Sequence, residues 1–344
     1  MRVAVVNTQT PFASGRADWL ADRLCEALQE HGHASELVRI PFCAAPPERV
    51  IDQMLAVRLL RVANVDRAIA LSFPAYLLPH DDKVVWLLRQ LREAYEPVGT
   101  PGRELPNTSL GRSVRSAVHA ADHTYLAEAT RIYAPSAAAG ARLNHHLGLP
   151  SDVLYPPLRQ PDRYRCDGYG DYVLALGRVS ANPAQRVAVT AMSLVQSEAR
   201  LIIAGPASSP GDLTALRDLA AELGVDDRIE FLAERLGDAE RIRLLAEARA
   251  VLWLPGPDNS SVHVALEAFQ SRKPVVVFAD AGQGYELVRD GMSGAVIASV
   301  AELAAALDEL TGSAALAERY GEAGFRHLQD AGISWETVVA ELTR

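Results

Sequence analysis

The densest set of chemistry-bearing residues lies between positions 251 and 294. An apolar run at 251–254 ends in a Pro-Gly-Pro turn, and four polar residues, 258–261 (DNSS), follow it. Residues of these types cap helices, and a helical pattern with Glu267 on it then covers 262–270. The first turn of a helix has unpaired backbone N–H groups and the positive end of the helix dipole. The stretch therefore predicts a helix start that binds an anion.

A second apolar run, 273–278, predicts a buried parallel strand, and the turn that follows it contains Gly282, Gln283 and Gly284. Glycine allows the backbone to approach a ligand closely. Because polar groups at the ends of parallel strands meet at one edge of a sheet, we expect this turn and the preceding helix start to face the same ligand.

These residues resemble the donor-binding core of the family 4 glycosyltransferases, the glycosyl transferases group 1. The positions in register with the family pattern are Glu267, Ala268, Pro274, Val275, Val276, Gly282, Glu286 and Val288. The resemblance implies an α/β fold with two Rossmann-like domains facing a cleft (GT-B). In the family, the second glutamate of the pattern holds the ribose of a nucleotide sugar, which implies that role for Glu267. The first glutamate contacts the transferred sugar, and Asn259 takes its place here, eight residues before Glu267.

The same resemblance implies that the backbone N–H groups of Ser260, Ser261 and Val262 bind the donor diphosphate. His263 lies four residues from both Asn259 and Glu267, so the three stack on one helix face. A His263 side chain that faces the ligand would contact sugar or phosphate. One that faces away would be ordinary surface, and the sequence leaves both alternatives open.

A candidate phosphate-binding arginine follows the apolar run at 172–176. Gly177 and Arg178 resemble the family's glycine-arginine element, in which the arginine and a later lysine meet the diphosphate. A guanidinium suits this role because it binds two phosphate oxygens at once and stays charged. The lysine is absent, Gln185 aligns with it, and Arg186 is the candidate second cation. The alternative for Arg186 is a solvated arginine at a helix start.

Three further residues are candidates by position. Gly15 ends the loop after the first strand, where the family has paired glycines that admit donor phosphate and acceptor, although any strand-to-helix turn favours glycine. Gly205 ends the run LIIAG, and Arg235 follows FLAE, the strand and loop that in the family lie near the nucleotide base. On the acceptor side, Arg89 and Leu91 replace two histidines of related sequences.

Strand-like and helical patterns alternate along the whole chain and predict parallel sheets covered by helices. The predicted strands are 3–6, 36–40, 67–72, 84–88, 131–134 and 153–155, then 172–176, 200–204, 229–232, 251–254, 274–278 and 295–297. The predicted helices are 17–30, 48–62, 109–120 and 137–147, then 184–196, 211–223, 238–248, 261–270, 300–310, 314–329 and 334–343. A linker pattern after Tyr155 predicts an acceptor-side domain at 1–157 and a nucleotide-sugar domain at 158–330. A terminal helix, 331–344, is expected to pack back on the first domain.

Composition narrows the class further. The chain has 344 residues, 49% of them hydrophobic, and a net charge of -9. Residues 1–157 hold 16 basic and 16 acidic residues, so the acidic excess lies in 158–344 and argues against nucleic acid as a partner. Only two of the 34 basic residues are lysines. Three cysteines without metal-binding spacing and the lack of a long apolar run predict a cytoplasmic protein.

We therefore expect a retaining glycosyltransferase that moves a sugar from a nucleoside-diphosphate sugar, with UDP or GDP as the expected nucleotide, to a small-molecule acceptor. No metal or other cofactor is expected, because arginines and backbone N–H groups would stabilise the departing diphosphate. The alternative is a catalytically degenerate relative that acts as a binding or regulatory subunit, since Asn259, Gln185, Arg89 and Leu91 all depart from the family pattern. Oligomeric state is left open.

Overall fold

The computed structural model describes residues 1–10, 12, 15–95, 105–254, 262–279 and 285–344. These residues form two compact units. Unit 1 comprises Met1–Arg159 and Ile333–Arg344, and unit 2 comprises Gln160–Gly332. Each unit contains one parallel six-stranded sheet with helices packed on its faces.

The sheet of unit 1 has the strand order β2-β1-β3-β4-β5-β6. Its central strands are apolar on both faces because helices cover both. The strands are β1 (Arg2–Gln9), β2 (Ala34–Pro41), β3 (Arg67–Ser72), β4 (Lys83–Arg89), β5 (Arg131–Ala134) and β6 (Asp152–Val153). The helices are α1 (Arg16–Glu30), η1 (Pro47–Arg49), α2 (Val50–Leu59), η2 (Ala75–Leu77), η3 (Arg92–Ala94), α3 (Ser109–Leu126), α4 (Ala137–Leu147) and α11 (Trp335–Thr343).

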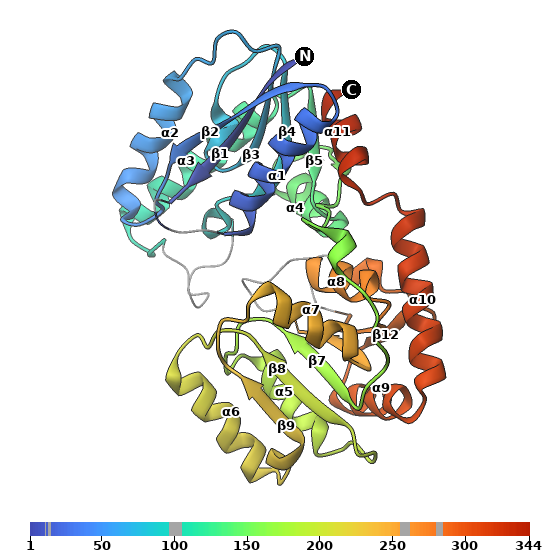
Figure 1. The fold of residues 1–344 in the computed structure, drawn as a ribbon. Helices are drawn as coiled ribbons and strands as arrows, with labels where there is room; N and C mark the ends of the chain where they lie inside the picture. The colour runs from blue at the N-terminus through green and yellow to red at the C-terminus, as the bar shows by residue number, and fades with distance from the viewer. Residues whose placement is uncertain (11, 13–14, 96–104, 255–261, 280–284) are drawn as a thin grey trace. The chain divides into compact units, whose positions relative to one another are not determined.

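Side-chain alternation along β1 divides the core of unit 1 between the two faces of the sheet. Val3 and Val5 pack with α1 and α11, whereas Ala4 and Val6 pack with α2, α3 and α4. Helix α11 comes from the far end of the chain and lies against α1 (Figure 1). It is anchored by Trp335, whose Nε1 donates to Leu158 O at 2.8 Å.

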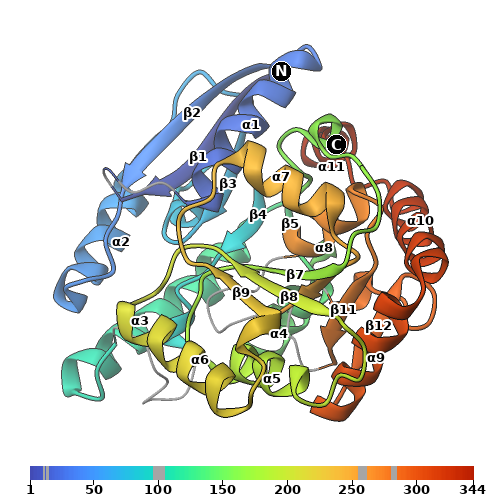
Figure 2. The ribbon, with the colours of Figure 1, turned by 60° about the horizontal axis from the view of Figure 1, so that its bottom comes forward.

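The sheet of unit 2 has the order β12-β11-β10-β7-β8-β9, with β7, β8 and β9 side by side in Figure 2. Its strands are β7 (Tyr172–Leu176), β8 (Arg200–Ala204), β9 (Ile229–Leu232), β10 (Ala250–Trp253), β11 (Val275–Phe278) and β12 (Gly294–Ile297). Its helices are η4 (Pro161–Arg163), α5 (Pro183–Met192), α6 (Pro210–Glu222), η5 (Asp226–Arg228), α7 (Asp238–Glu247), α8 (His263–Gln270), η6 (Tyr285–Leu287), α9 (Val300–Gly312) and α10 (Ala314–Asp330).

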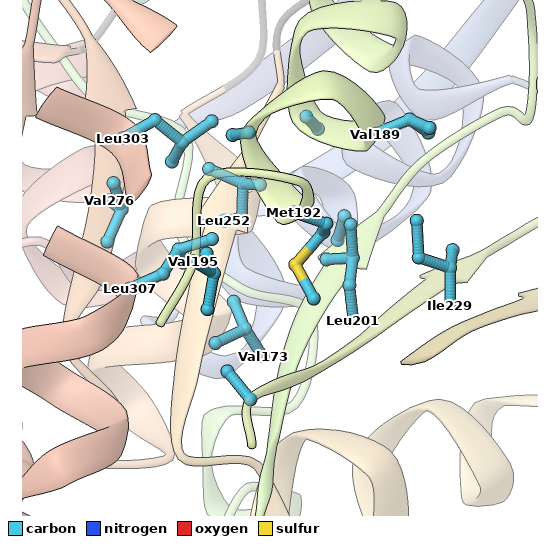
Figure 3. Close-up of a cluster of buried hydrophobic side chains, with 14 of the residues drawn as sticks. Val173, Val189, Met192, Val195, Leu201, Ile229, Leu252, Val276, Leu303 and Leu307 are labelled. Carbon is cyan, nitrogen blue, oxygen red and sulfur yellow. The ribbon is translucent and has the colours of Figure 1, made fainter. Parts of the chain in front are cut away.

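One face of this sheet carries the main core of unit 2. Figure 3 shows side chains of the central strands meeting those of α5 and α9; they include Val173, Leu201, Leu252, Val276, Met192, Leu303 and Leu307. Helix α8 contacts β10 and β11 and also packs on α10. The core therefore holds the strands in a fixed order and leaves their carboxyl ends to carry polar loops.

Three predicted helices differ from the structure by several residues. The helix predicted at 184–196 is α5, which ends at Met192. The helix predicted at 109–120 continues to Leu126 because Val118 and Leu126 keep the same buried face of α3. The helix predicted at 48–62 begins as the 3-10 turn η1 and ends at Leu59. Within the described ranges, no helix combines the length and apolar character needed to cross a membrane.

Each sheet has a topological switch point, where successive connections leave in opposite directions. In unit 1 it lies between β1 and β3, and in unit 2 between β7 and β10. Open parallel sheets bind ligands at the carboxyl ends of the strands beside such a point. The fold therefore predicts ligand sites at the residues that follow β1 and β3 in unit 1 and β7 and β10 in unit 2.

Candidate functional site

The loop after β7 carries Gly177 and Arg178, and its path depends on glycine. Gly177 has a φ of 156° and Gly205, directly after β8, a φ of 147°. A Cβ on Gly205 would lie 2.0 Å from Gly177 O. The two strand ends can approach this closely because position 205 has no side chain. Arg178 is exposed beside them.

Gln185, which aligns with the family's phosphate-binding lysine, has a structural role here. Its side chain is buried, its Oε1 accepts a hydrogen bond from Ser180 N at 2.9 Å, and its Nε2 donates to Arg178 O at 2.7 Å. The side-chain amide of Gln185 thus fixes the backbone of the Arg178 loop. Arg186, the next residue of α5, is exposed, so the candidate second cation is accessible to a ligand.

Glu267 lies on α8 and is buried, with 7% of its surface exposed. Its Oε1 accepts a hydrogen bond from Tyr164 Oη at 3.1 Å, and its Oε2 pairs with Arg241 Nη2. Burial alone would lower the pKa of Arg241, but the charge and hydrogen bond of Glu267, together with Tyr164 and Asp238, more than offset this, so the pKa is raised. Burial and the nearby Glu267 charge raise the pKa of Tyr164. The arginine therefore stays charged and the tyrosine stays neutral at neutral pH.

His263 begins α8 and is 2% exposed. The alternative in which it is ordinary surface is therefore wrong. Val262 precedes it and is also buried. The other predicted residues of this region, Asn259, Ser260 and Ser261 and the turn residues Gly282, Gln283 and Gly284, lie outside the described residues.

Neighbouring strands bring the remaining candidates to one edge of unit 2. The loop with Arg178 follows β7, and α8 with Glu267 comes after β10, which pairs with β7. Gly205 follows β8 on the other side of β7. Arg235 is exposed in the loop after β9, at the end of the sheet. The structure thus groups Arg178 and Gly205 closely and places Arg235 two strands away from β7.

Unit 1 contains a pocket of about 140 Å³ at its own switch point, between the ends of β1, β3 and β4 and the start of α1. Its lining residues are Thr8, Thr10, Gly15, Ala17, Asp18, Ser72 and Arg89. Gly15 was a candidate from the sequence and Arg89 was noted as replacing a family histidine, and both line this pocket. Leu91, the other residue that replaces a family histidine, is instead buried in the apolar core.

Hydrogen bonds fix the polar wall of this pocket. Ser72 Oγ donates to Asn7 Oδ1 at 2.6 Å and accepts from Thr8 N at 3.1 Å. Asn7 Nδ2 in turn donates to Ala17 O at 3.3 Å, and Gly15 N donates to Asp18 Oδ2 at 2.7 Å. The wall therefore combines ordered hydroxyl groups with one carboxylate, and Arg89 adds a positive charge. Among the described residues, no group of three or more His, Cys, Asp and Glu side chains could hold a metal ion.

Sequence reasoning missed the partners of Glu267. Arg241 lies on α7 and Tyr164 follows η4, so they are 26 and 103 residues from Glu267 in the chain. It also missed Asp18 and Ser72 in the unit 1 pocket. A signal existed for Asp18, because an acid three residues after Gly15 is the position from which a side chain bonds back to the helix start.

Residues 170–313 match the family described as Glycosyl transferases group 1. The matched segment runs from before β7 to the end of α9 and includes Gly177, Arg178 and Glu267. Unit 2 therefore contains a glycosyl transferases group 1 domain, which confirms the resemblance inferred from the sequence.

Solved structures show the same architecture over the whole chain. The Anabaena protein Alr3699/HepE, crystallised with UDP and glucose, has a TM-score of 0.69 at 14% identity, covering 99% of this chain and 98% of its own. Sucrose-phosphate synthase from Thermosynechococcus elongatus has a TM-score of 0.73 at 15% identity, covering 99% and 97%. The fold class is thus the GT-B fold of glycosyltransferases, as predicted.

A curated relative is similar over part of the chain. The D-inositol 3-phosphate glycosyltransferase of Nocardia farcinica is 36% identical over 138 residues, which are 39% of this chain and 30% of the relative. The aligned part thus spans less than a third of that protein's length. The group 1 domain and the similarity to this relative together indicate the glycosyltransferase class.

Proposed function

We propose that this protein is a retaining, metal-independent glycosyltransferase that moves a sugar from a nucleoside-diphosphate sugar to a small-molecule acceptor. One observation supports the proposal: within a group 1 glycosyltransferase domain, Arg178 follows β7 and Glu267 lies on the helix after β10, and these are the two strands beside the switch point of the sheet. The guanidinium and the carboxylate are the groups that a diphosphate and a ribose require.

On the donor side, Arg178 would bind oxygens of the diphosphate, with Arg186 as a second cation. Because Gly205 has no side chain, the backbone after β8 packs directly against Gly177, next to Arg178. Glu267 would accept hydrogen bonds from ribose hydroxyls. When the bond between sugar and phosphate breaks, negative charge grows on the departing diphosphate. Fixed positive groups stabilise that charge without reorganising, which lowers the barrier.

In the retaining reaction, the acceptor hydroxyl attacks the anomeric carbon on the face from which the diphosphate leaves. A diphosphate oxygen takes the acceptor proton, so no protein base is needed. Asn259 would then contact the transferred sugar through its amide, where a glutamate stands in the family pattern. This change gives a neutral contact and is expected to alter sugar preference rather than abolish transfer.

The pocket of unit 1 is our candidate for the acceptor site. Hydroxyls of Thr8 and Ser72, the Asp18 carboxylate and the Arg89 guanidinium suit a small polyhydroxylated molecule with a negative group. The similarity to a D-inositol 3-phosphate glycosyltransferase supports the same chemistry. We therefore propose a phosphorylated polyol as the acceptor class.

The degenerate-relative alternative rested on three departures from the family pattern. One of them, Gln185, is explained by its bonds to the Arg178 loop. A second, Arg89, lines a polar pocket. These positions therefore have roles that do not depend on a loss of activity.

A ligand panel tests the proposal. UDP, GDP, TDP and ADP are compared by thermal shift and calorimetry, and we expect one of them to stabilise the protein. Arg178→Ala should weaken that nucleotide by roughly 10- to 100-fold, because a hydrogen bond between charged groups is lost. Arg217→Ala, an exposed arginine on α6, is the control and should bind normally.

Transfer is then measured as release of the nucleoside diphosphate from its sugar, with and without a phosphorylated polyol. Chelation with EDTA should leave the rate unchanged. Binding of none of the four nucleotides, or equal affinity in wild type and Arg178→Ala, would remove the assignment.

A further inference from the structure

The carboxylate of Glu267 is held by two side chains from other segments of unit 2. Arg241 approaches from α7 and bonds to Oε2, and Tyr164 approaches from the chain after η4 and bonds to Oε1 at 3.1 Å. The Glu267 side chain is 9% exposed and that of Arg241 34%. The carboxylate thus has one donor on each oxygen and little freedom to rotate.

The Glu267 carboxylate can accept more hydrogen bonds than it receives from Tyr164 and Arg241. Each carboxylate oxygen can accept about two hydrogen bonds. Tyr164 occupies one position on Oε1 and Arg241 one on Oε2. Within the part of the chain that the structure describes, one acceptor position per oxygen therefore remains, which matches a vicinal pair of hydroxyl groups that both donate.

The charge of Arg241 also decides whether Glu267 can act as an acceptor. A carboxylate this buried is costly without a compensating charge, and it would take up a proton or turn towards water. A protonated carboxyl group uses one of its oxygens as a donor, so it cannot accept hydrogen bonds equally well from both hydroxyls of a diol. Asp238, at the start of α7, adds only negative charge near this pair, so the compensating positive charge comes from Arg241.

We propose that Arg241 and Tyr164 are positioning residues that hold the Glu267 carboxylate in an ion pair and oriented for the two ribose hydroxyls of the donor nucleotide. The proposal rests on the function proposed above. It adds that ribose recognition depends on a residue of α7 that touches the carboxylate and acts through it. Arg241 should therefore matter only when the ligand has ribose hydroxyls.

Calorimetry with paired nucleotides isolates this effect. The probes are UDP and 2′,3′-dideoxy-UDP, or the guanosine pair if GDP is the preferred ligand. Wild type should bind the ribose nucleotide roughly 10- to 100-fold more tightly than the dideoxy form, which is typical of two hydrogen bonds to a charged group. Arg241→Met should bring this ratio close to one while it leaves the dideoxy affinity nearly unchanged. Arg241→Lys should restore part of the ratio, and Tyr164→Phe should lower it less than Arg241→Met.

Arg243→Met is the matched control, since Arg243 lies on the same helix, is exposed and pairs with Glu240 and Glu247. It should keep the wild-type ratio. If Arg241→Met does not fold, the double variant Arg241→Met with Glu267→Gln avoids an unpaired buried charge. This variant should match Glu267→Gln alone in both affinities, because Arg241 acts only through the carboxylate.

Three outcomes contradict the inference, and the first two differ in what they say of the proposed function. A wild-type ratio of 10 or more that survives in Arg241→Met overturns the role of Arg241 and leaves the transferase assignment standing. A wild-type ratio near one overturns both the role of Arg241 and the ribose contact of Glu267. An equal loss of both affinities in Arg241→Met would show a structural role only.

Discussion

Asp122 should make the stability of unit 1 depend on pH near neutrality. It lies on α3, is fully buried, and accepts hydrogen bonds from Tyr76 Oη at 2.8 Å and Tyr95 Oη at 2.7 Å. Burial raises the pKa of Asp122 to about 7, although the bonds from the two tyrosines lower it. We predict that Asp122→Asn removes most of this pH dependence.

The direction and size of this pH dependence follow from proton binding to Asp122 in the folded and unfolded states. Below about pH 4 the carboxyl is protonated whether the chain is folded or unfolded, so its contribution does not change. From there to about pH 7, the unfolded chain releases the proton and the folded chain keeps it. The free energy of unfolding therefore falls as pH rises, by about 4 kcal/mol between the ordinary value of 3.8 and about 7. The asparagine variant, which carries no charge, should gain by that amount relative to wild type.

Scanning calorimetry from pH 4 to pH 8 measures this difference and can resolve separate transitions for the two units. His119, which stacks on Tyr95 with ring centroids 4.2 Å apart, is present in both proteins, so its contribution cancels in the comparison. Asp81→Asn, at an exposed position, serves as the control and should keep the wild-type slope. Parallel pH profiles for wild type and Asp122→Asn would refute the reasoning.

Two further predictions concern a glycine and a thiol. Gly205→Ala should lower the stability of unit 2 by at least about 2 kcal/mol and weaken nucleotide binding, because the new Cβ meets Gly177 O at 2.0 Å. Calorimetry measures both effects. The control is Gly312→Ala, which should be near neutral because nothing lies within 4 Å of the added atom. Burial raises the pKa of the Cys25 thiol to about 11, so at pH 8 a thiol reagent should label exposed Cys43 much faster than Cys25. Similar labelling rates, read by mass spectrometry of tryptic peptides, would contradict the burial of Cys25.

Strand positions were predictable because short apolar runs between polar breaks fit buried parallel strands. The predicted strands at 67–72, 131–134 and 172–176 agree with β3, β5 and β7 to the residue. Helix ends were harder to predict. The end of α3 at Leu126 depends on what its last turns pack against, which the polar pattern after position 120 does not reveal.

The bias towards arginine was visible in the sequence, but the role of the two lysines was not. Lys83 and Lys273 are both fully buried. Lys83 Nζ donates to Tyr125 O at 2.8 Å and to Tyr76 O at 3.2 Å, and Lys273 Nζ lies 3.1 Å from Cys166 Sγ. A compact ammonium can bond to several groups in a small space, where a planar guanidinium would not fit. Such a role depends on neighbours that no spacing in the sequence identifies.

By itself, the sequence determined the alternation of strands and helices, the position of Gly177 and Arg178 after a strand, and the position of Glu267 on a helix. The periodicity of apolar side chains is enough for this, because it assigns each element its buried face. Only the tertiary structure decided that Gln185 turns back onto the Arg178 loop and that Arg241 pairs with Glu267. The polar groups that come into contact depend on how the helices and strands pack against one another. This packing depends on the volumes of all their side chains together.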